Sequence, residues 1–73
     1  IRVNAIAPGL ILTETIKAEL PEDVRSRVKA MQIVKRDGAE EDVVGAALWL
    51  ASPAASFVTG ETIRVSGGAT LQV

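Results

Sequence analysis

The stretch Asn4-Ala5-Ile6-Ala7-Pro8-Gly9-Leu10-Ile11-Leu12-Thr13 decides the fold. An apolar run that begins at Ile1 ends abruptly in Pro8-Gly9, and a helical spacing of apolar residues begins after Thr13. Runs of this kind, bounded by turn residues, are typical of strands buried on both faces of a parallel sheet. Ligands of open α/β sheets bind beyond the carboxyl ends of such strands, so we expect any ligand-binding residues in this turn.

Two short helices are expected after the turn. The first covers residues 13–20, in which Ile16 and Leu20 have helix-compatible spacing. Pro21 suits the first position of a second helix, and the two acidic residues that follow it complement the positive end of the helix dipole. Apolar residues of the second helix recur on one face at Val24, Val28 and Met31. Asp37-Gly38 ends this segment.

Residues 39–51 carry the strongest helix signal in the chain. Three acidic residues open it, which again complements the helix dipole. Its spacing predicts one broad apolar face made of Val43, Val44, Ala47, Leu48 and Ala51. Gly45 and Ala46 allow close approach of another backbone. Ser52-Pro53 ends the helix, because proline disfavours the helical conformation of the residue before it.

A second strand is expected at Thr62–Val65, between the turn at Thr59-Gly60 and the Gly67-Gly68 loop. Its residues Ile63 and Val65 share one face. The order of strand, helices and strand predicts an α/β fold with two parallel strands joined by a crossover. Two strands and one good helix leave sheet edges and a sheet face uncovered, so we expect further polypeptide to pack against them.

Composition excludes several classes of protein. The 73 residues include no Cys and no His, which rules out a disulfide and the usual zinc ligands, and we expect no metal site. The net charge of −1 and the scarcity of aromatic residues argue against nucleic-acid binding. No apolar run approaches the roughly 20 residues of a transmembrane helix, and no signal-peptide pattern opens the chain. A cytoplasmic protein without membrane contact is expected, and a core this small indicates part of a larger domain.

Four motifs in order resemble the C-terminal part of the short-chain dehydrogenases/reductases. They are the run from Ile1 to Gly9 with Thr13 four residues on, Arg36-Asp37-Gly38, residues 46–52, and residues 59–68. The match covers nearly the whole chain and is weakest at residues 15–34, and Ser66 departs from the Asp that the family often has. The resemblance implies that residues 1–73 form a single partial domain, the C-terminal portion of a Rossmann-type, doubly wound parallel sheet.

The same resemblance implies hydride transfer between NAD or NADP and an alcohol or carbonyl. The family's glycine-rich loop, catalytic Ser and Tyr-x-x-x-Lys pair lie upstream of the matched region, and this sequence has no Tyr. None of the 73 residues is therefore expected to be catalytic, and alone they are expected to be inactive. The implied partners are the remainder of the Rossmann domain, a small-molecule alcohol or carbonyl, and further copies of the same subunit in a homo-oligomer.

The resemblance also implies a cofactor site at Pro8, Gly9, Ile11 and Thr13. Gly9 has no Cβ and allows the backbone to pass close to the nicotinamide ring, although Pro8-Gly9 also suits a plain turn. Ile11 resembles the position whose backbone N–H and C=O pair with the carboxamide, with core packing as the alternative. Thr13 resembles a residue that contacts the carboxamide or a phosphate, and Thr is also a favoured helix N-cap.

Residues 14–35 correspond to the family's substrate lid and are called the lid segment below. The residues expected to shape a substrate pocket are Leu12, Ile16, Leu20 and Met31, and the alternative is an amphipathic pair of surface helices. The helix Glu40–Ala51 and the strand Thr62–Val65 resemble elements that pack against symmetry mates, with burial inside one chain as the alternative.

Three polar residues near the strands are expected to be structural. Asn4 is expected to tie neighbouring strands or loops together, because a polar side chain on a buried strand needs hydrogen-bond partners. Arg2 and Arg64 are expected to be surface charges. A different class of function also fits the exposed edges and the apolar helix, namely a non-catalytic module that docks on a partner and acts through assembly.

Overall fold

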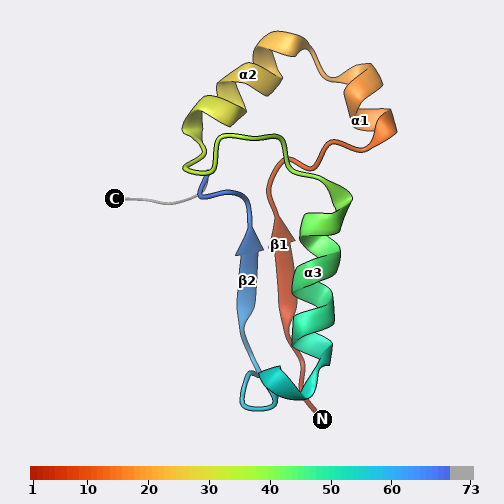
Figure 1. The fold of residues 1–73 in the computed structure, drawn as a ribbon, viewed down its shortest axis with the longest axis vertical. Helices are drawn as coiled ribbons and strands as arrows, with labels where there is room; N and C mark the ends of the chain where they lie inside the picture. The colour runs from red at the N-terminus through yellow and green to blue at the C-terminus, as the bar shows by residue number, and fades with distance from the viewer. Residues whose placement is uncertain (70–73) are drawn as a thin grey trace.

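The computed structural model describes residues 1–69. Its elements in chain order are β1 (Ala5–Pro8), α1 (Glu14–Glu19), α2 (Glu22–Met31), α3 (Glu40–Ala51), the 3-10 helix η1 (Pro53–Ala55) and β2 (Thr62–Val65). Both strands point the same way, and α1 and α2 lie beyond their carboxyl ends (Figure 1). The predicted order of strand, helices and strand is confirmed.

The two strands form a parallel pair in the register Ala5 with Thr62 to Pro8 with Val65. Further backbone hydrogen bonds extend the ladder at both ends, from Ala5 N–H to Glu61 O at 2.9 Å and from Gly9 N–H to Val65 O at 2.8 Å. Ala5 N–H and Gly9 N–H both donate toward β2, so the nitrogen of Pro8 faces away from β2 and its missing N–H costs no hydrogen bond of the ladder. α3 packs against both strands and provides the crossover between them. The predicted parallel α/β arrangement is confirmed.

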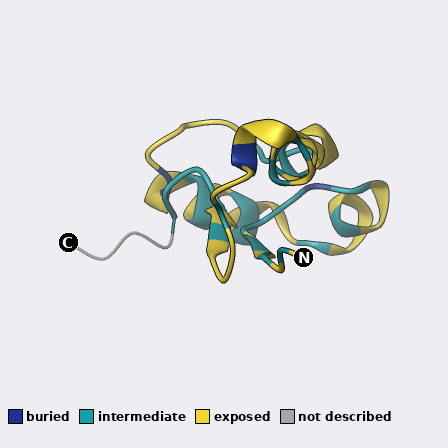
Figure 2. Cartoon of the chain, turned by 90° about the horizontal axis from the view of Figure 1, so that it is seen from below, coloured by how far each residue is buried: buried dark blue, intermediate teal, exposed yellow. Residues whose placement is uncertain are grey.

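The expectation that the first strand is buried on both faces is wrong for the described residues. Ala5 and Pro8 are exposed, Ile6 and Ala7 are half-buried, and Ile1 and Val3 lie before the strand with exposed side chains. The reason is that only two strands are present and only α3 packs on them. Exposed and half-buried residues accordingly cover most of the cartoon in Figure 2.

The predicted single apolar face of α3 is also wrong. Of its five residues only Val43 is half-buried, whereas Val44 and Leu48 are 53% and 67% exposed. The half-buried apolar positions are instead Val43, Ala46 and Leu50. α3 is apolar on nearly every side after its acidic first turn, so spacing could not select the face that meets the sheet.

Two polar side chains tie the amino end of β1 to the segment before β2. Asn4 donates to Val58 O and accepts from Glu61 N–H, both at 3.0 Å, which confirms its predicted structural role. Arg2 was expected to be a surface charge, and this expectation is wrong. Its half-buried guanidinium donates to Val58 O at 3.0 Å and to Leu50 O at 2.8 Å, near the C-terminal end of α3, where a cation is favourable.

The core of the described region is small. Leu12 and Ala55 are its buried apolar residues and Gln32 its buried polar residue. No helix within residues 1–69 is both long and apolar enough to cross a membrane. The same part of the chain contains no cluster of carboxylates that could hold a metal ion.

Candidate functional site

The carboxyl end of β1 continues into residues 9–13, which we call the site loop. A Cβ added to Gly9 would lie 2.8 Å from the Cα and the Cβ of Ser66, a distance that Cβ atoms do not adopt. Position 9 therefore requires glycine because its backbone lies close to Ser66, the residue that follows β2. The strand ends at Pro8 as predicted, and the cofactor role of Pro8 and Gly9 stays a prediction.

The middle of the site loop is held by Gly38. Leu12 N–H donates to Gly38 O at 2.9 Å, and Ile11 forms a parallel bridge with Gly38. Ile11 O accepts from Thr13 N–H at 3.1 Å. The N–H of Ile11, in contrast, donates to no atom within residues 1–69. The N–H of Leu10 likewise donates to no atom there, so the half-buried loop presents two main-chain donors at the carboxyl edge of the sheet.

Thr13 caps α1. Its Oγ1 accepts a hydrogen bond from Ile16 N–H at 3.3 Å, and its backbone carbonyl accepts from Lys17 N–H at 2.9 Å. The N-cap reading of Thr13 is therefore confirmed. A hydroxyl that accepts one hydrogen bond can still donate its proton to a second partner, so the predicted ligand contact is compatible with the cap.

The four residues expected to shape a substrate pocket differ in burial. Leu12 is buried, Ile16 and Leu20 are half-buried, and Met31 is 60% exposed at the end of α2. None of the four lines the cavity described next. The described residues do not unite them in one pocket, and their role stays a prediction.

A cavity of about 330 Å³ lies beside the site loop. Its walls come from the site loop, the segment after α2, the first half of α3 and the end of β2. They comprise Leu10, Ile11, Gln32, Val34, Arg36, Gly38, Asp42, Ala46, Arg64, Val65, Ser66 and Gly67. Sequence reasoning singled out only Ile11 among these as a site residue, because the wall combines four segments whose proximity no local pattern reveals.

Arg36 and Asp42 form the strongest ion pair of the cavity wall. The guanidinium donates two hydrogen bonds to the carboxylate, at 2.6 and 2.8 Å, and the same carboxylate accepts from Ala39 N–H at 2.8 Å. The hydrogen bonds from Arg36 and then from Ala39 hold the pKa of Asp42 well below its ordinary value. The hydrogen bond to Asp42 likewise raises the pKa of Arg36. The pair therefore stays charged and fixes the start of α3.

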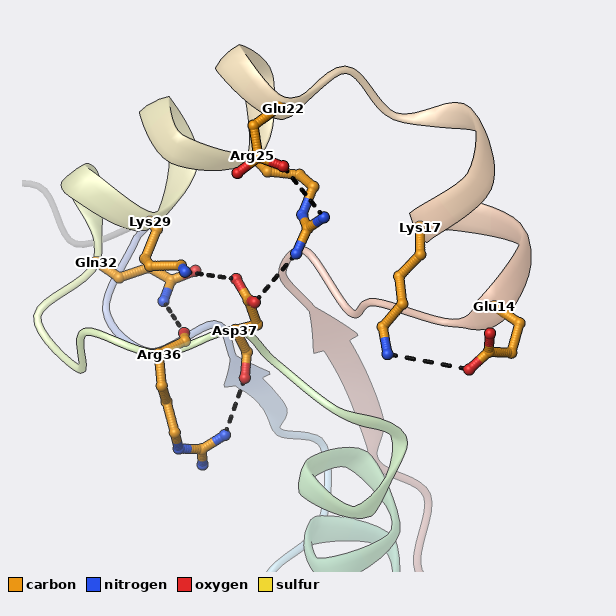
Figure 3. A network of polar contacts seen from close by, with 8 residues as sticks. All are labelled: Glu14, Lys17, Glu22, Arg25, Lys29, Gln32, Arg36 and Asp37. Atoms are coloured by element: carbon orange, nitrogen blue, oxygen red, sulfur yellow. Dashed lines mark hydrogen bonds and ion pairs between the residues drawn. The ribbon is translucent and has the colours of Figure 1, made fainter.

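A second carboxylate, Asp37, faces α2. It accepts from Lys29 at 3.1 Å and from Arg25 at 3.3 Å, and both partners project from α2 toward it (Figure 3). The hydrogen bond from Lys29 is the largest cause that lowers the pKa of Asp37, and burial opposes it. A network of opposite charges thus joins the lid segment to the residue before Gly38.

Gln32 is a buried amide that sequence reasoning did not single out. Its Nε2 donates to Val34 O at 2.9 Å and to Arg36 O at 2.7 Å, which closes the turn after α2. The backbone N–H groups of Ile33 and Val34 then donate to Gly67 O at 2.7 and 2.9 Å. The signal was present in the sequence as a lone amide between Met31 and Ile33, since an amide in an apolar run needs partners.

Comparison with known proteins finds dehydrogenases and reductases that are similar to this chain. The profile of the family described as enoyl-(acyl carrier protein) reductase matches residues 1–70. The chain is 44% identical to 7alpha-hydroxysteroid dehydrogenase of Escherichia coli (strain K12) and covers 27% of that protein. It is 48% identical to glucose 1-dehydrogenase 2 of Bacillus subtilis (strain 168) and covers 28% of it. These alignments include 93% and 97% of this chain.

Solved structures agree with the sequence comparisons. A 7 alpha-hydroxysteroid dehydrogenase solved in complex with NADH and 7-oxo glycochenodeoxycholic acid superposes on 93% of this chain with a TM-score of 0.87 and 44% identity, and this chain covers 27% of it. The chain belongs to the short-chain dehydrogenase/reductase family and spans about a quarter of the length of the relatives it matches. The predicted family and fold are confirmed.

Proposed function

We propose that the chain supplies the nicotinamide-side loop and the substrate lid of an NAD(P)-dependent oxidoreductase that interconverts an alcohol and a carbonyl. The observation that carries this proposal is the Ile11 N–H, which donates to no atom within residues 1–69 although its loop is held on both sides. Gly9 N–H is bonded to Val65 O and Leu12 N–H to Gly38 O. A polar group kept available in a held loop, at the carboxyl edge of a parallel sheet, favours a ligand as its partner.

The groups at the site loop fit the nicotinamide carboxamide. That amide carries one acceptor oxygen and two donor hydrogens, and Ile11 offers a main-chain donor and a carbonyl with a second lone pair. The Thr13 hydroxyl can donate while it caps α1. When bound, the cofactor would take up or deliver a hydride at its nicotinamide ring. The role of this chain is to orient the carboxamide, and orientation of this kind can account for several kcal/mol of a reaction barrier.

Proton transfer is assigned to groups other than these residues. The sequence has no Tyr, His or Cys, and Asp37 and Asp42 are engaged in ion pairs. We propose that the proton donor and the phosphate-binding turn come from other residues of the subunit. The 73 residues alone should then show no dehydrogenase activity.

The lid segment covers the carboxyl ends of both strands (Figure 1). This position supports its assignment to the substrate side, with Leu12, Ile16, Leu20 and Met31 as candidate contacts. The helix α3 exposes Val44, Leu48 and Trp49. We propose that this face packs against a second copy of the subunit. The substitution Leu48→Glu should then lower the assembly state seen by sedimentation, whereas the exposed Lys35→Glu should not.

Exposed apolar residues also favour the second candidate, a non-catalytic assembly module. Phe57 and Leu48 are 101% and 67% exposed. Both the oxidoreductase and the assembly module would need further polypeptide to pack against these residues. The two candidates differ in cofactor binding, because only the oxidoreductase requires a free donor at Ile11.

The experiment is a titration of the full-length protein with NADH and with NADPH. Binding is measured from the change in nicotinamide fluorescence. The substitution Ile11→Pro removes the main-chain donor, whereas Ile11→Val retains it. Ile11→Val should bind within about twofold of the parent, and Ile11→Pro should lose about tenfold or more, as expected when a buried partner is left unsatisfied. Far-UV circular dichroism checks that both variants fold. A parental Kd in folded Ile11→Pro refutes the role of Ile11, and no binding by the parent favours the assembly module.

A further inference from the structure

Ion pairs join α2 to the segment that follows it, and its apolar residues Val24 and Val28 are half-buried. Within residues 1–69, packing between elements joins α3 to β1, β2 and η1, and β1 to β2, whereas α2 takes no part in it. None of the residues of α2 is buried. A helix attached in this way depends on few contacts and opens at a low free energy.

Asp37 receives two of these contacts. Its carboxylate binds the Lys29 ammonium at 3.1 Å and the Arg25 guanidinium at 3.3 Å, and these two cations lie one turn apart on α2 (Figure 3). The Arg25 side chain is only 24% exposed, and its Nε is buried without a hydrogen-bond partner. Within residues 1–69, the other anion that pairs with Arg25 is Glu22, at 3.5 Å and 82% exposed. Asp37, with a side chain 37% exposed, is therefore the less exposed partner of a partly buried cation.

The residue after Asp37 is bonded to the site loop. Gly38 O accepts from Leu12 N–H at 2.9 Å, and a Cβ added to Gly38 would lie 2.6 Å from Leu10 O. The two backbones thus approach as closely as glycine permits. Because Asp37 and Gly38 are adjacent in sequence, the residue bonded to the site loop lies next to the carboxylate that contacts α2.

We propose that Asp37 is a positioning residue that couples the lid segment to the site loop, so that occupation of the loop by a nicotinamide cofactor orders α2. This inference rests on the function proposed above. It also predicts that the link is electrostatic and runs from Leu12 through Gly38 and Asp37 to Arg25 and Lys29, with equal coupling in both directions.

The test is to measure backbone hydrogen exchange of the full-length protein by mass spectrometry, with and without NADH. In the parent, NADH should slow exchange both in residues 8–13 and in α2. In Asp37→Asn it should still slow exchange in residues 8–13, but α2 should exchange about two- to tenfold faster than in the parent, as expected for two lost, partly exposed ion pairs. Asp37→Glu should restore much of the protection of α2.

Asp23→Asn is the matched control. It removes the Asp23–Arg27 pair, 3.6 Å long and about three-quarters exposed on the same helix, without touching Asp37. This variant should respond to NADH as the parent does. Lys29→Met provides a second route if Asp37→Asn fails to fold, because it removes one partner from the α2 side and should weaken the response of α2 in the same direction.

Two failures can be told apart. If NADH protects residues 8–13 and α2 equally in the parent and in Asp37→Asn, the coupling role of Asp37 is overturned while the cofactor site stands. If NADH protects neither region in the parent, the proposed cofactor site is overturned together with the coupling that depends on it.

Discussion

The carboxylate of Asp42 accepts two hydrogen bonds from the guanidinium of Arg36, at 2.6 and 2.8 Å. It also accepts from Ala39 N–H, one turn earlier, and so closes the first turn of α3. One side chain therefore joins the end of the segment after α2 to the start of the helix that packs on the sheet. Asp37 makes the corresponding connection on the other side, to α2.

Both carboxylates predict how stability depends on pH. The pKa values of Asp42 and Asp37 are lowered in the folded protein, relative to about 3.9 in an unfolded chain. Their stabilising contribution is therefore complete above the unfolded pKa and is lost as the pH falls through the folded pKa. The urea concentration at the midpoint of unfolding of the full-length protein should decrease as the pH is lowered from about 5 to about 2. Asp42→Asn should lower the midpoint at neutral pH and flatten this decline, and parallel curves for variant and parent would contradict the assignment.

Thr13 should separate capping from cofactor binding. Thr13→Ala removes the cap of α1 and should cost about 0.5–2 kcal/mol of stability, in addition to weakening cofactor binding. Thr13→Asp keeps a cap acceptor but removes the hydroxyl proton and adds a negative charge near the proposed cofactor. It should therefore retain stability and lose NADH affinity. Chemical denaturation and NADH titration measure the two properties separately. If Thr13→Asp binds NADH as the parent does, Thr13 is a cap alone.

Alanine substitutions at Gly38 and at Gly45 should change the stability of the protein in opposite directions. A Cβ at Gly38 would meet Leu10 O at 2.6 Å, so Gly38→Ala should destabilise the fold by about 1–3 kcal/mol. A Cβ at Gly45, within α3, would meet no atom within 4 Å. Gly45→Ala should stabilise the helix by about 0.5–1 kcal/mol, because alanine is the better helix former. Thermal melts measure both changes. A loss of stability in Gly45→Ala, with a lower assembly state, would indicate that a second copy packs on α3 at this residue.

The 73 residues prepared alone should not fold cooperatively. Leu12 and Ala55 are the buried apolar residues of the described region, whereas Leu48, Phe57 and Val3 are among those largely exposed. So small a buried area cannot offset the conformational entropy lost on folding. Differential scanning calorimetry should show no sharp transition, or sedimentation should show self-association. A sharp melt of a monodisperse monomer is the contrary result.

The local signals that correctly located the elements were turn and cap chemistry. Pro8-Gly9 ended β1, Thr13 capped α1, Ser52-Pro53 ended α3, and Thr59-Gly60 preceded β2. Each of these effects acts within a few residues along the chain, so it can be inferred without the fold. The family was equally predictable, because several motifs occurred in the expected order.

Burial and the cavity could not be predicted in the same way. The apolar face of α3 was assigned to Val44 and Leu48, yet both are exposed, because a helix that is apolar on most sides carries no mark of the side that meets a sheet. The sequence predicts a surface charge at Arg2, but the Arg2 guanidinium donates to carbonyls of residues about 50 positions away.

The sequence alone determined the order of elements, the parallel α/β class and the family, since these depend on local turn chemistry and on motif order. Only the tertiary structure decided that Gly9 faces Ser66, that Gly38 holds Leu12, and that Asp37 faces Arg25 and Lys29. Those contacts join segments whose distance along the chain is unrelated to their distance in space, and the crossover of two parallel strands brings them together.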